Sequence, residues 1–405
     1  MSFWREIPPT AGLPVSIRDI AAFFSKERDG GSLERDFTSF LDVAYTRVTC
    51  SGTAGLYFIA ETLKALSPKR TVIIPAFTCP LVPLAIARAG LKVQVCDIRK
   101  DNFDIDATEL ERLCRENNDI LAVVVNHLGG LPSDMEAIAG IVQNRGILIV
   151  EDCAQSLGAE YKGRKVGTFG DFAFFSMAAG KGLTMYEGGV VTAKLSNHAR
   201  LLDQNIDALE RKDPWEEAKR ITGLCGYAVF YRPSLFWFVY RLPEIFWQWA
   251  GHKMKALSED FASDFPIQKV SLFRKFIGHR NFHTLESAIG SQRQKAEVYK
   301  KALQRYPGII VVQEAPGARA TYPYVAVIVD AADPVAMQPL EEMGIGLSRS
   351  FSRAVPDYED LKGVVLPGAC PNARFMAAHL WTFSTSQFMR PDDIQKVSDR
   401  VTKRC

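Results

Sequence analysis

Short β-branched runs alternate with helical patterns from Val48 to Ala193, and this alternation constrains the fold more than any other feature. The runs are apolar throughout, as in strands that are covered on both faces. Such strands separated by helices predict an α/β fold with a mostly parallel, doubly wound sheet. The expected strands are 71–75, 92–98, 120–130, 147–155, 171–177 and 188–193, with helices at 80–90, 106–116 and 133–146.

The pattern changes after Ala193, and this change predicts a second, smaller α+β domain. Residues 194–275 are helical and rich in aromatics, and a long helix at 282–303 leads into short strands. We expect a large domain over 1–278, with an aromatic insertion at about 205–275, and a small domain over 279–405. Within the large domain, Ser133 is the expected N-cap of its helix.

The composition excludes several classes of protein. A formal net charge of +3 over 405 residues, without a dense basic run, argues against nucleic acid as the partner. The eight cysteines form no C-x-x-C pair, so neither a metal site nor a redox pair is expected. Reduced cysteines, with no secretory signal and no transmembrane segment, predict a cytoplasmic protein.

Polar residues stand where the expected strands end, which is where α/β sheets bind ligands. Ser51, Gly52 and Thr53 precede a helix, whose N-terminus either binds a phosphate or is simply capped. Asp152 ends an apolar strand. A buried carboxylate there needs a cationic partner such as a protonated pyridine nitrogen, unless it only caps the next helix.

Lys181 lies between Gly180 and Gly182, just after an apolar run. Glycines let the backbone pass close to a ligand, and a desolvated lysine becomes a nucleophilic amine suited to a Schiff base. The alternative is an ordinary solvated loop lysine. Gln155 and Ser176 could supply further hydrogen bonds to the same ligand.

These signals are weak singly, and together they indicate one cofactor. A phosphate site, an aspartate for a pyridinium and a lysine for an aldehyde are what pyridoxal 5′-phosphate (PLP) requires. The aspartate keeps the ring nitrogen protonated, and the lysine amine can move the substrate proton.

The chain resembles the DegT/StrS family of PLP-dependent sugar aminotransferases, of fold type I. The resemblance lies in "SGTAGL", "VIIPAFT", "NHLGGLPSDMEAI", "VEDCAQSLGAEYKGRKVGTFGDFAFFS", "KGLTMYEGGVV" and "LESAIGSQRQK", in family order. It implies a doubly wound domain, a smaller C-terminal domain and a homodimer with active sites at the subunit interface.

The resemblance also assigns roles to residues. It implies that Lys181 forms the Schiff base, that Asp152 pairs with the pyridine nitrogen and that Gln155 bonds the ring hydroxyl side. The expected phosphate site comprises Gly52, Thr53, Ala54 and Ser176. Members with histidine at the lysine position are dehydratases, so Lys181 favours transamination.

Several positions depart from the family pattern. Cys79 stands where an aromatic residue often stacks on the cofactor ring, and His279 stands where an asparagine often reaches the partner subunit's phosphate. Arg349 and Arg353 either pair with an anionic substrate group or are solvated. His127 either shapes the pocket or makes structural hydrogen bonds.

The aromatic segment 226–253 has three interpretations. It forms core or dimer interface, which is the leading one, or it lines an apolar substrate pocket, or it lies on a membrane surface. The expected function is transfer of an amino group, from glutamate, to a keto-sugar on a nucleotide or other carrier, for cell-envelope polysaccharide or natural-product biosynthesis. The alternatives are a PLP-dependent dehydratase or lyase, and a non-catalytic binding or regulatory homologue.

Overall fold

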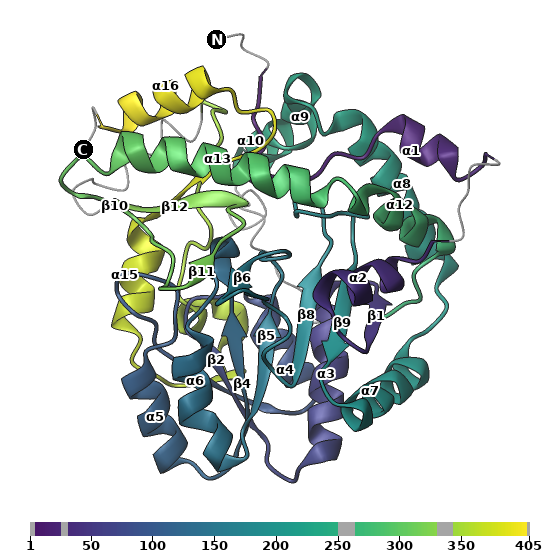
Figure 1. Cartoon of the computed structure of the whole chain (residues 1–405), viewed down its shortest axis with the longest axis vertical. Coiled ribbons are helices and arrows are strands. Elements are labelled where there is room, and N and C mark those ends of the chain that lie inside the picture. The colour runs from purple at the N-terminus through teal and green to yellow at the C-terminus, as the bar shows by residue number, and fades with distance from the viewer. Residues whose placement is uncertain (1–4, 26–30, 250–263, 330–342, 403–405) are drawn as a thin grey trace.

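A computed structural model describes residues 5–25, 31–249, 264–329 and 343–402 (Figure 1). Its centre is an eight-stranded sheet with the order β1-β9-β8-β5-β4-β2-β3-β14. These strands are β1 (Thr46–Thr49), β2 (Thr71–Pro75), β3 (Lys92–Cys96), β4 (Ile120–Asn126), β5 (Leu148–Asp152), β8 (Phe172–Ser176), β9 (Gly189–Ala193) and β14 (Val365–Leu366).

The strands from β14 to β8 are parallel, and β9 is antiparallel to both of its neighbours. The predicted strands and the mostly parallel sheet are therefore confirmed. The helices that follow them are α3 (Gly52–Leu66), α4 (Leu81–Arg88), α5 (Ala107–Glu116), α6 (Met135–Val142) and α7 (Ser196–Leu209).

Alternate residues of β4 explain why the sheet is covered on both faces. Val124 lies in one apolar cluster with Phe58 of α3, and Val123 lies in another with Leu110 of α5 and Ile138 of α6. All seven residues of β4 are buried, which accounts for the uninterrupted apolar run in the sequence.

One predicted cap is wrong. Helix α6 begins at Met135, and the side chain that caps it is that of Asp134, which accepts from the Ala137 N–H at 3.1 Å. The Ser133 hydroxyl instead donates to the Asn126 carbonyl at 2.7 Å. Ser133 is buried and thus ties this loop to the end of β4.

The C-terminal part forms a separate antiparallel sheet with the order β10-β12-β15-β13. Its strands are β10 (Ile309–Val311), β12 (Tyr324–Val329), β13 (Leu347–Ser348) and β15 (Leu380–Ser384), and helices α13 (Leu285–Leu303), α15 (Pro371–His379) and α16 (Pro391–Thr402) accompany them. A small third sheet has the order β11-β6-β7, from β6 (Glu160–Tyr161), β7 (Arg164–Lys165) and β11 (Ala318–Arg319). The predicted division between 278 and 279 falls inside α12 (Leu272–Phe282) and stays a prediction.

The aromatic insertion is helical, as expected. It contains α8 (Pro214–Phe230), α9 (Pro233–Val239) and α10 (Arg241–Trp249). Helix α8 lies beside the N-terminal helix α1 (Ile17–Ala22), while α2 (Leu33–Leu41) packs on α12 (Figure 1). Residues 250–253 of the predicted segment lie outside the described residues. Among the helices described, none combines the length and apolarity that a membrane crossing requires.

The insertion has an inner and an outer side. Leu224, Tyr227, Ala228 and Tyr231 are buried in a cluster with α12. Large apolar residues on its outer side are exposed, namely Val229, Phe230, Phe238, Val239, Tyr240, Leu242, Ile245, Phe246 and Trp249. The core interpretation is therefore confirmed for the inner side only.

Candidate active site

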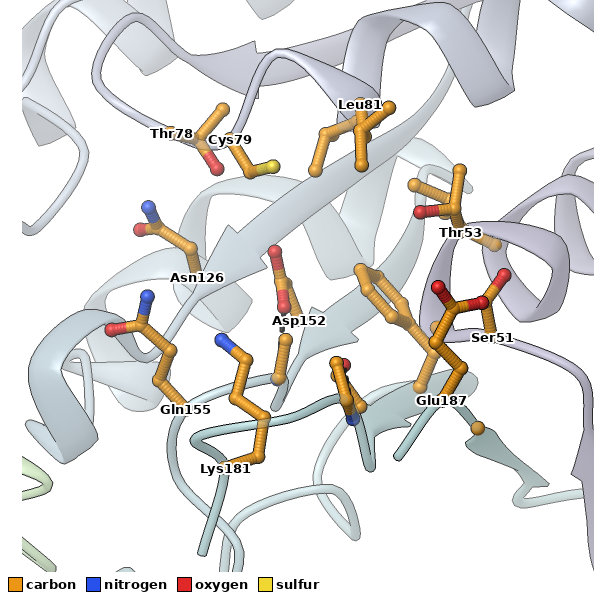
Figure 2. Close-up of a pocket in the computed structure, with 18 of the residues that line it drawn as sticks. Ser51, Thr53, Thr78, Cys79, Leu81, Asn126, Asp152, Gln155, Lys181 and Glu187 are labelled. Carbon is orange, nitrogen blue, oxygen red and sulfur yellow. Dashed lines mark hydrogen bonds between the residues drawn. The ribbon is translucent and has the colours of Figure 1, made fainter. Parts of the chain in front are cut away.

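A cavity of about 380 Å³ lies beyond the carboxyl ends of β4, β5 and β8. Asn126, Asp152 and Ser176, the last residues of these three strands, line it together with the start of α3 (Figure 2). The cavity therefore lies where the sequence predicted a ligand site, beyond the carboxyl ends of the parallel strands.

The N-terminus of α3 forms one end of this cavity. The Ser51 hydroxyl accepts from the Ala54 N–H at 3.0 Å, and the Gly55 N–H bonds to the Ser51 carbonyl. The N–H groups of Gly52 and Thr53 therefore have no acceptor within the described part of the chain. Free amides at a helix N-terminus suit an anion.

Of the residues expected to bind the phosphate, Ser176 lines the cavity and Ala54 does not. Ser176 lines the cavity so close to Gly52 that a Cβ on the glycine would lie 3.2 Å from the serine Cβ. Ala54 is buried, its N–H is engaged by Ser51, and it is not a lining residue. Its side chain therefore supports the helix start from behind.

Asp152 ends β5, opposite Asn126 in the strand register. One carboxylate oxygen accepts from the Ala154 N–H at 3.0 Å, while the other has no hydrogen-bond partner within the described residues. Burial raises the pKa of this carboxyl group, and the charge of Lys181 opposes that rise. A buried carboxylate with a free oxygen that faces a cavity can accept from a cationic ligand.

Lys181 extends from its loop into the cavity towards Asp152 (Figure 2). Burial lowers the pKa of its amine, and the negative charge of Asp152 opposes this shift. Gly180 has the left-handed conformation (φ 79°) that the sequence suggested, whereas no such conformation occurs at Gly182. Lys181 is therefore not an ordinary solvated loop lysine.

Gln155 and Cys79 complete the wall around the lysine. The Gln155 carbonyl oxygen accepts from the Gly129 N–H at 2.9 Å and from the Tyr324 hydroxyl at 2.7 Å. These two bonds orient the amide so that its NH₂ group is left to donate elsewhere. Burial raises the pKa of the Cys79 thiol to about 11, so this side chain is neutral at physiological pH.

His127 is fully enclosed and held by hydrogen bonds at both ring nitrogens. Nδ1 accepts from the Ser133 N–H at 3.0 Å, so Nε2 carries the proton and donates to Glu151, 3.1 Å away. The Glu151 carboxylate also accepts from the backbone N–H groups of Gly167, Phe169 and Gly170. This geometry fits the structural interpretation of His127, although the residue borders the cavity.

Three predicted residues lie away from the cavity. His279 Nδ1 is 2.5 Å from Asp36 on α2. Arg349 donates to the carbonyls of Ala377 and Ala378 at the end of α15, and this placement does not support a substrate role. Arg353 is half-buried near Glu359 and is not a lining residue.

Other lining residues were absent from the expected site. Among them are Thr78, Asn126, Glu187, Arg220, Phe265, Pro266 and Phe351. Asn126 has a buried Oδ1 atom without a hydrogen-bond partner, and its position at a strand end was the available signal. Phe265 and Arg220 lie far along the chain, and no local pattern marks them.

Comparison with known proteins agrees with this geometry. The family model of the DegT/DnrJ/EryC1/StrS aminotransferases matches residues 22–223 and 269–402. GDP-perosamine synthase from Vibrio cholerae is 28% identical over 201 residues, which cover 48% of this chain and 53% of that protein. The chain thus spans about half the length of this curated relative in the match.

Two solved structures share the whole fold. Sugar aminotransferase CalS13 from Micromonospora echinospora has a TM-score of 0.74 at 19% identity, with 98% of this chain and 99% of that chain covered. GDP-4-keto-6-deoxymannose-3-dehydratase (ColD) also has a TM-score of 0.74 at 19% identity, with 98% and 100% covered. The fold is therefore common to both activities. Since the family model covers well over half of the chain, this protein belongs to the DegT/DnrJ/EryC1/StrS aminotransferase family.

Proposed function

We propose that the protein is a PLP-dependent aminotransferase. The observation that carries this proposal is the convergence of Lys181 and Asp152 in one cavity that also contains the free amides of Gly52 and Thr53. An amine, a carboxylate and an anion site match the aldehyde, the pyridine nitrogen and the phosphate of this cofactor.

The described residues fit the group. Asp152 has a free oxygen for the ring nitrogen, and the Gln155 NH₂ group is available for the ring oxygen. The hydroxyl groups of Ser51 and Ser176 border the phosphate end. When bound, PLP supplies an electron-accepting ring that stabilises negative charge on the substrate carbon.

Lys181 is the residue that would exchange the proton. Because burial lowers the pKa of its amine, a larger fraction of Lys181 is neutral at a given pH than for a solvated lysine. With PLP bound, a neutral amine here would hold the cofactor through its aldehyde carbon, with loss of water, and would accept or return a proton at the substrate carbon.

The proposed reaction takes an amino group from glutamate to a keto-sugar carried by a nucleotide or another carrier. The relative named GDP-perosamine synthase supports a nucleotide-linked substrate. A cell-envelope polysaccharide or natural-product pathway would use such a product. Phe265 and Phe351 give the cavity an apolar rim on which a sugar or base could pack.

A PLP-dependent dehydratase is the second candidate, because ColD shares the fold to the same degree as CalS13. Lys181 favours transamination, since the amine is available for proton transfer in both directions. A non-catalytic role is less well supported, because Lys181, Asp152, Gln155 and Ser176 all line one cavity.

We also propose a cytoplasmic homodimer. The exposed apolar residues of α9 and α10 support a contact outside the cavity, and a second copy of the chain is the occupant we expect. Contact with a membrane surface is the alternative. His279 reaching the partner's phosphate remains part of this proposal, although in one chain its ring is paired with Asp36.

Absorption spectroscopy tests the proposal. Purified protein with added PLP should show a visible Schiff-base band that borohydride abolishes and that Lys181→Ala lacks. Addition of glutamate should convert the cofactor to its amine form and release 2-oxoglutarate. A protein that takes up no PLP would contradict the cofactor assignment, and failure with every amino donor would favour the dehydratase or lyase.

A further inference from the structure

The lysines, arginines and acidic residues that line the cavity form two pairs of opposite charge. Lys181 and Asp152 form the first pair, to which the proposed function already assigns roles. Glu187 and Arg220 form the second, with Arg220 Nη1 2.9 Å from Glu187 Oε1. Arg220 belongs to α8, and its Nη2 is 3.7 Å from Glu216 on the same helix.

The second pair lies at the phosphate end of the cavity. Glu187 is followed by Gly188 and Gly189, whose backbone runs against the start of α3. A Cβ on Gly189 would lie 2.5 Å from the Ser51 carbonyl oxygen and 2.7 Å from the Gly52 nitrogen. Figure 2 shows the Glu187 carboxylate next to Ser51, on the side of the cavity opposite Asn126 and Gln155.

Arg220 has unused hydrogen-bonding capacity in this place. Its Nη1 and Nη2 atoms pair with Glu187 and Glu216, and each of them carries a second N–H group that is left for an anion. A guanidinium presents its donors in a planar fork that matches phosphate oxygens. The described cavity wall contains one lysine, Lys181, and one arginine, Arg220. Lys181 lies near Asp152, so Arg220 is the basic side chain still available for another anion.

We propose that Arg220 binds the phosphate group of the cofactor, and that Glu187, its ion-pair partner, competes with that phosphate for the guanidinium. This inference rests on the proposed function. Its ligand is a phosphate monoester dianion, which the amides of Gly52 and Thr53 engage from the other side. Because Glu187 carries the opposite charge beside the same anion, the two residues have opposite effects on phosphate affinity.

The test compares PLP with pyridoxal, which lacks the phosphate. Dissociation constants for both are measured by absorption titration of cofactor-free protein, and the pyridoxal-to-PLP ratio reports the contribution of the phosphate. We expect Arg220→Gln to lower this ratio roughly tenfold to hundredfold, with little change for pyridoxal. Glu187→Gln should raise the ratio. Lys219→Gln, a loss of the same charge at an exposed position of α8 paired with Glu216, should leave it unchanged.

Each outcome is decisive. Equal weakening of both ligands in Arg220→Gln, or a ratio equal to that of the wild type, would overturn the inference. If Arg220→Gln does not fold by circular dichroism, Arg220→Met, which keeps the apolar stem of the side chain, replaces it, and a ratio equal to that of the wild type overturns the inference. Wild-type protein that binds neither ligand would instead contradict the proposed function.

Discussion

The Thr10 hydroxyl donates a 2.7 Å hydrogen bond to the carbonyl oxygen of Gly180, the residue that precedes the cavity lysine. Three residues later, the Leu13 N–H bonds to the carbonyl of Lys181 itself at 3.2 Å. Residues 10–13 lie outside the regions that the family model matches. The N-terminal stretch, which precedes the matched region, therefore holds the Lys181 loop.

Loss of this hydroxyl should loosen the Lys181 loop. We expect Thr10→Val to lower the free energy of unfolding by about 0.5–1.5 kcal/mol, because the Gly180 carbonyl loses its partner. Schiff-base formation with PLP, followed by borohydride trapping, should also become slower. Thr10→Ser keeps the hydroxyl and serves as the control. Equal rates in Thr10→Val and wild type would show that the loop is held by other contacts.

The pH dependence of Lys181 reactivity should change when Asp152 is neutralised. Burial lowers the pKa of the Lys181 amine, and the negative charge of Asp152 partly offsets this by favouring the ammonium form. The wild-type rate of Schiff-base formation with pyridoxal should therefore rise with pH through a midpoint below that of a solvated lysine. In Asp152→Asn the midpoint should move to still lower pH.

Rapid-mixing absorbance across a pH series measures both midpoints. Asp101→Asn, at an exposed position paired with Arg99, is the matched control and should keep the wild-type midpoint. A midpoint that moves to higher pH in Asp152→Asn would show that the carboxylate acts on Lys181 by something other than its charge.

Arg349 should matter for stability and not for binding of anionic ligands. Its guanidinium donates to the Ala377 carbonyl at 2.6 Å and lies over the Trp381 ring at 5.6 Å. We expect Arg349→Met to lower the free energy of unfolding in urea by about 1–2 kcal/mol. The affinity for 2-oxoglutarate, a dicarboxylate, should stay unchanged, as in the control Arg353→Met. Weaker binding without destabilisation would restore the substrate role.

The sequence predicts the sheet well, and it also singles out Lys181, Asp152, Gln155 and Ser176, which line one cavity, because both depend on local patterns. The apolar run at 120–126 is typical of a strand that is covered on both faces of a parallel sheet, and Asp152 stands at a strand end. Ser133 shows the limit of such reasoning, since Asp134 competes successfully for the same cap. Arg220, on α8, and Phe265, in an irregular segment, could not be found, because their approach to the cavity depends on how distant parts of the chain pack.

The aromatic insertion has a role that its composition did not reveal. The buried Tyr227 hydroxyl donates to the Leu13 carbonyl at 2.9 Å, and its ring stacks on that of Tyr231 at 4.4 Å. Since Leu13 bonds to Lys181, the insertion supports the Lys181 loop through the N-terminal stretch. The inner side of α8 thus has a structural explanation, and the exposed apolar residues of α8, α9 and α10 are left for the proposed subunit contact.

The outer side of α10 should mediate subunit contact. Leu242, Ile245 and Trp249 recur at helical spacing on one face and are 44%, 46% and 84% exposed. Replacing all three with serine should shift the protein from dimer to monomer in sedimentation velocity. The fold should persist, because exposed substitutions change stability little. Serine at the separately exposed Leu195, Ile310 and Met343 is the matched control. Wild-type flotation with anionic liposomes that the α10 variant loses, at an unchanged sedimentation coefficient, would assign this face to a membrane surface instead.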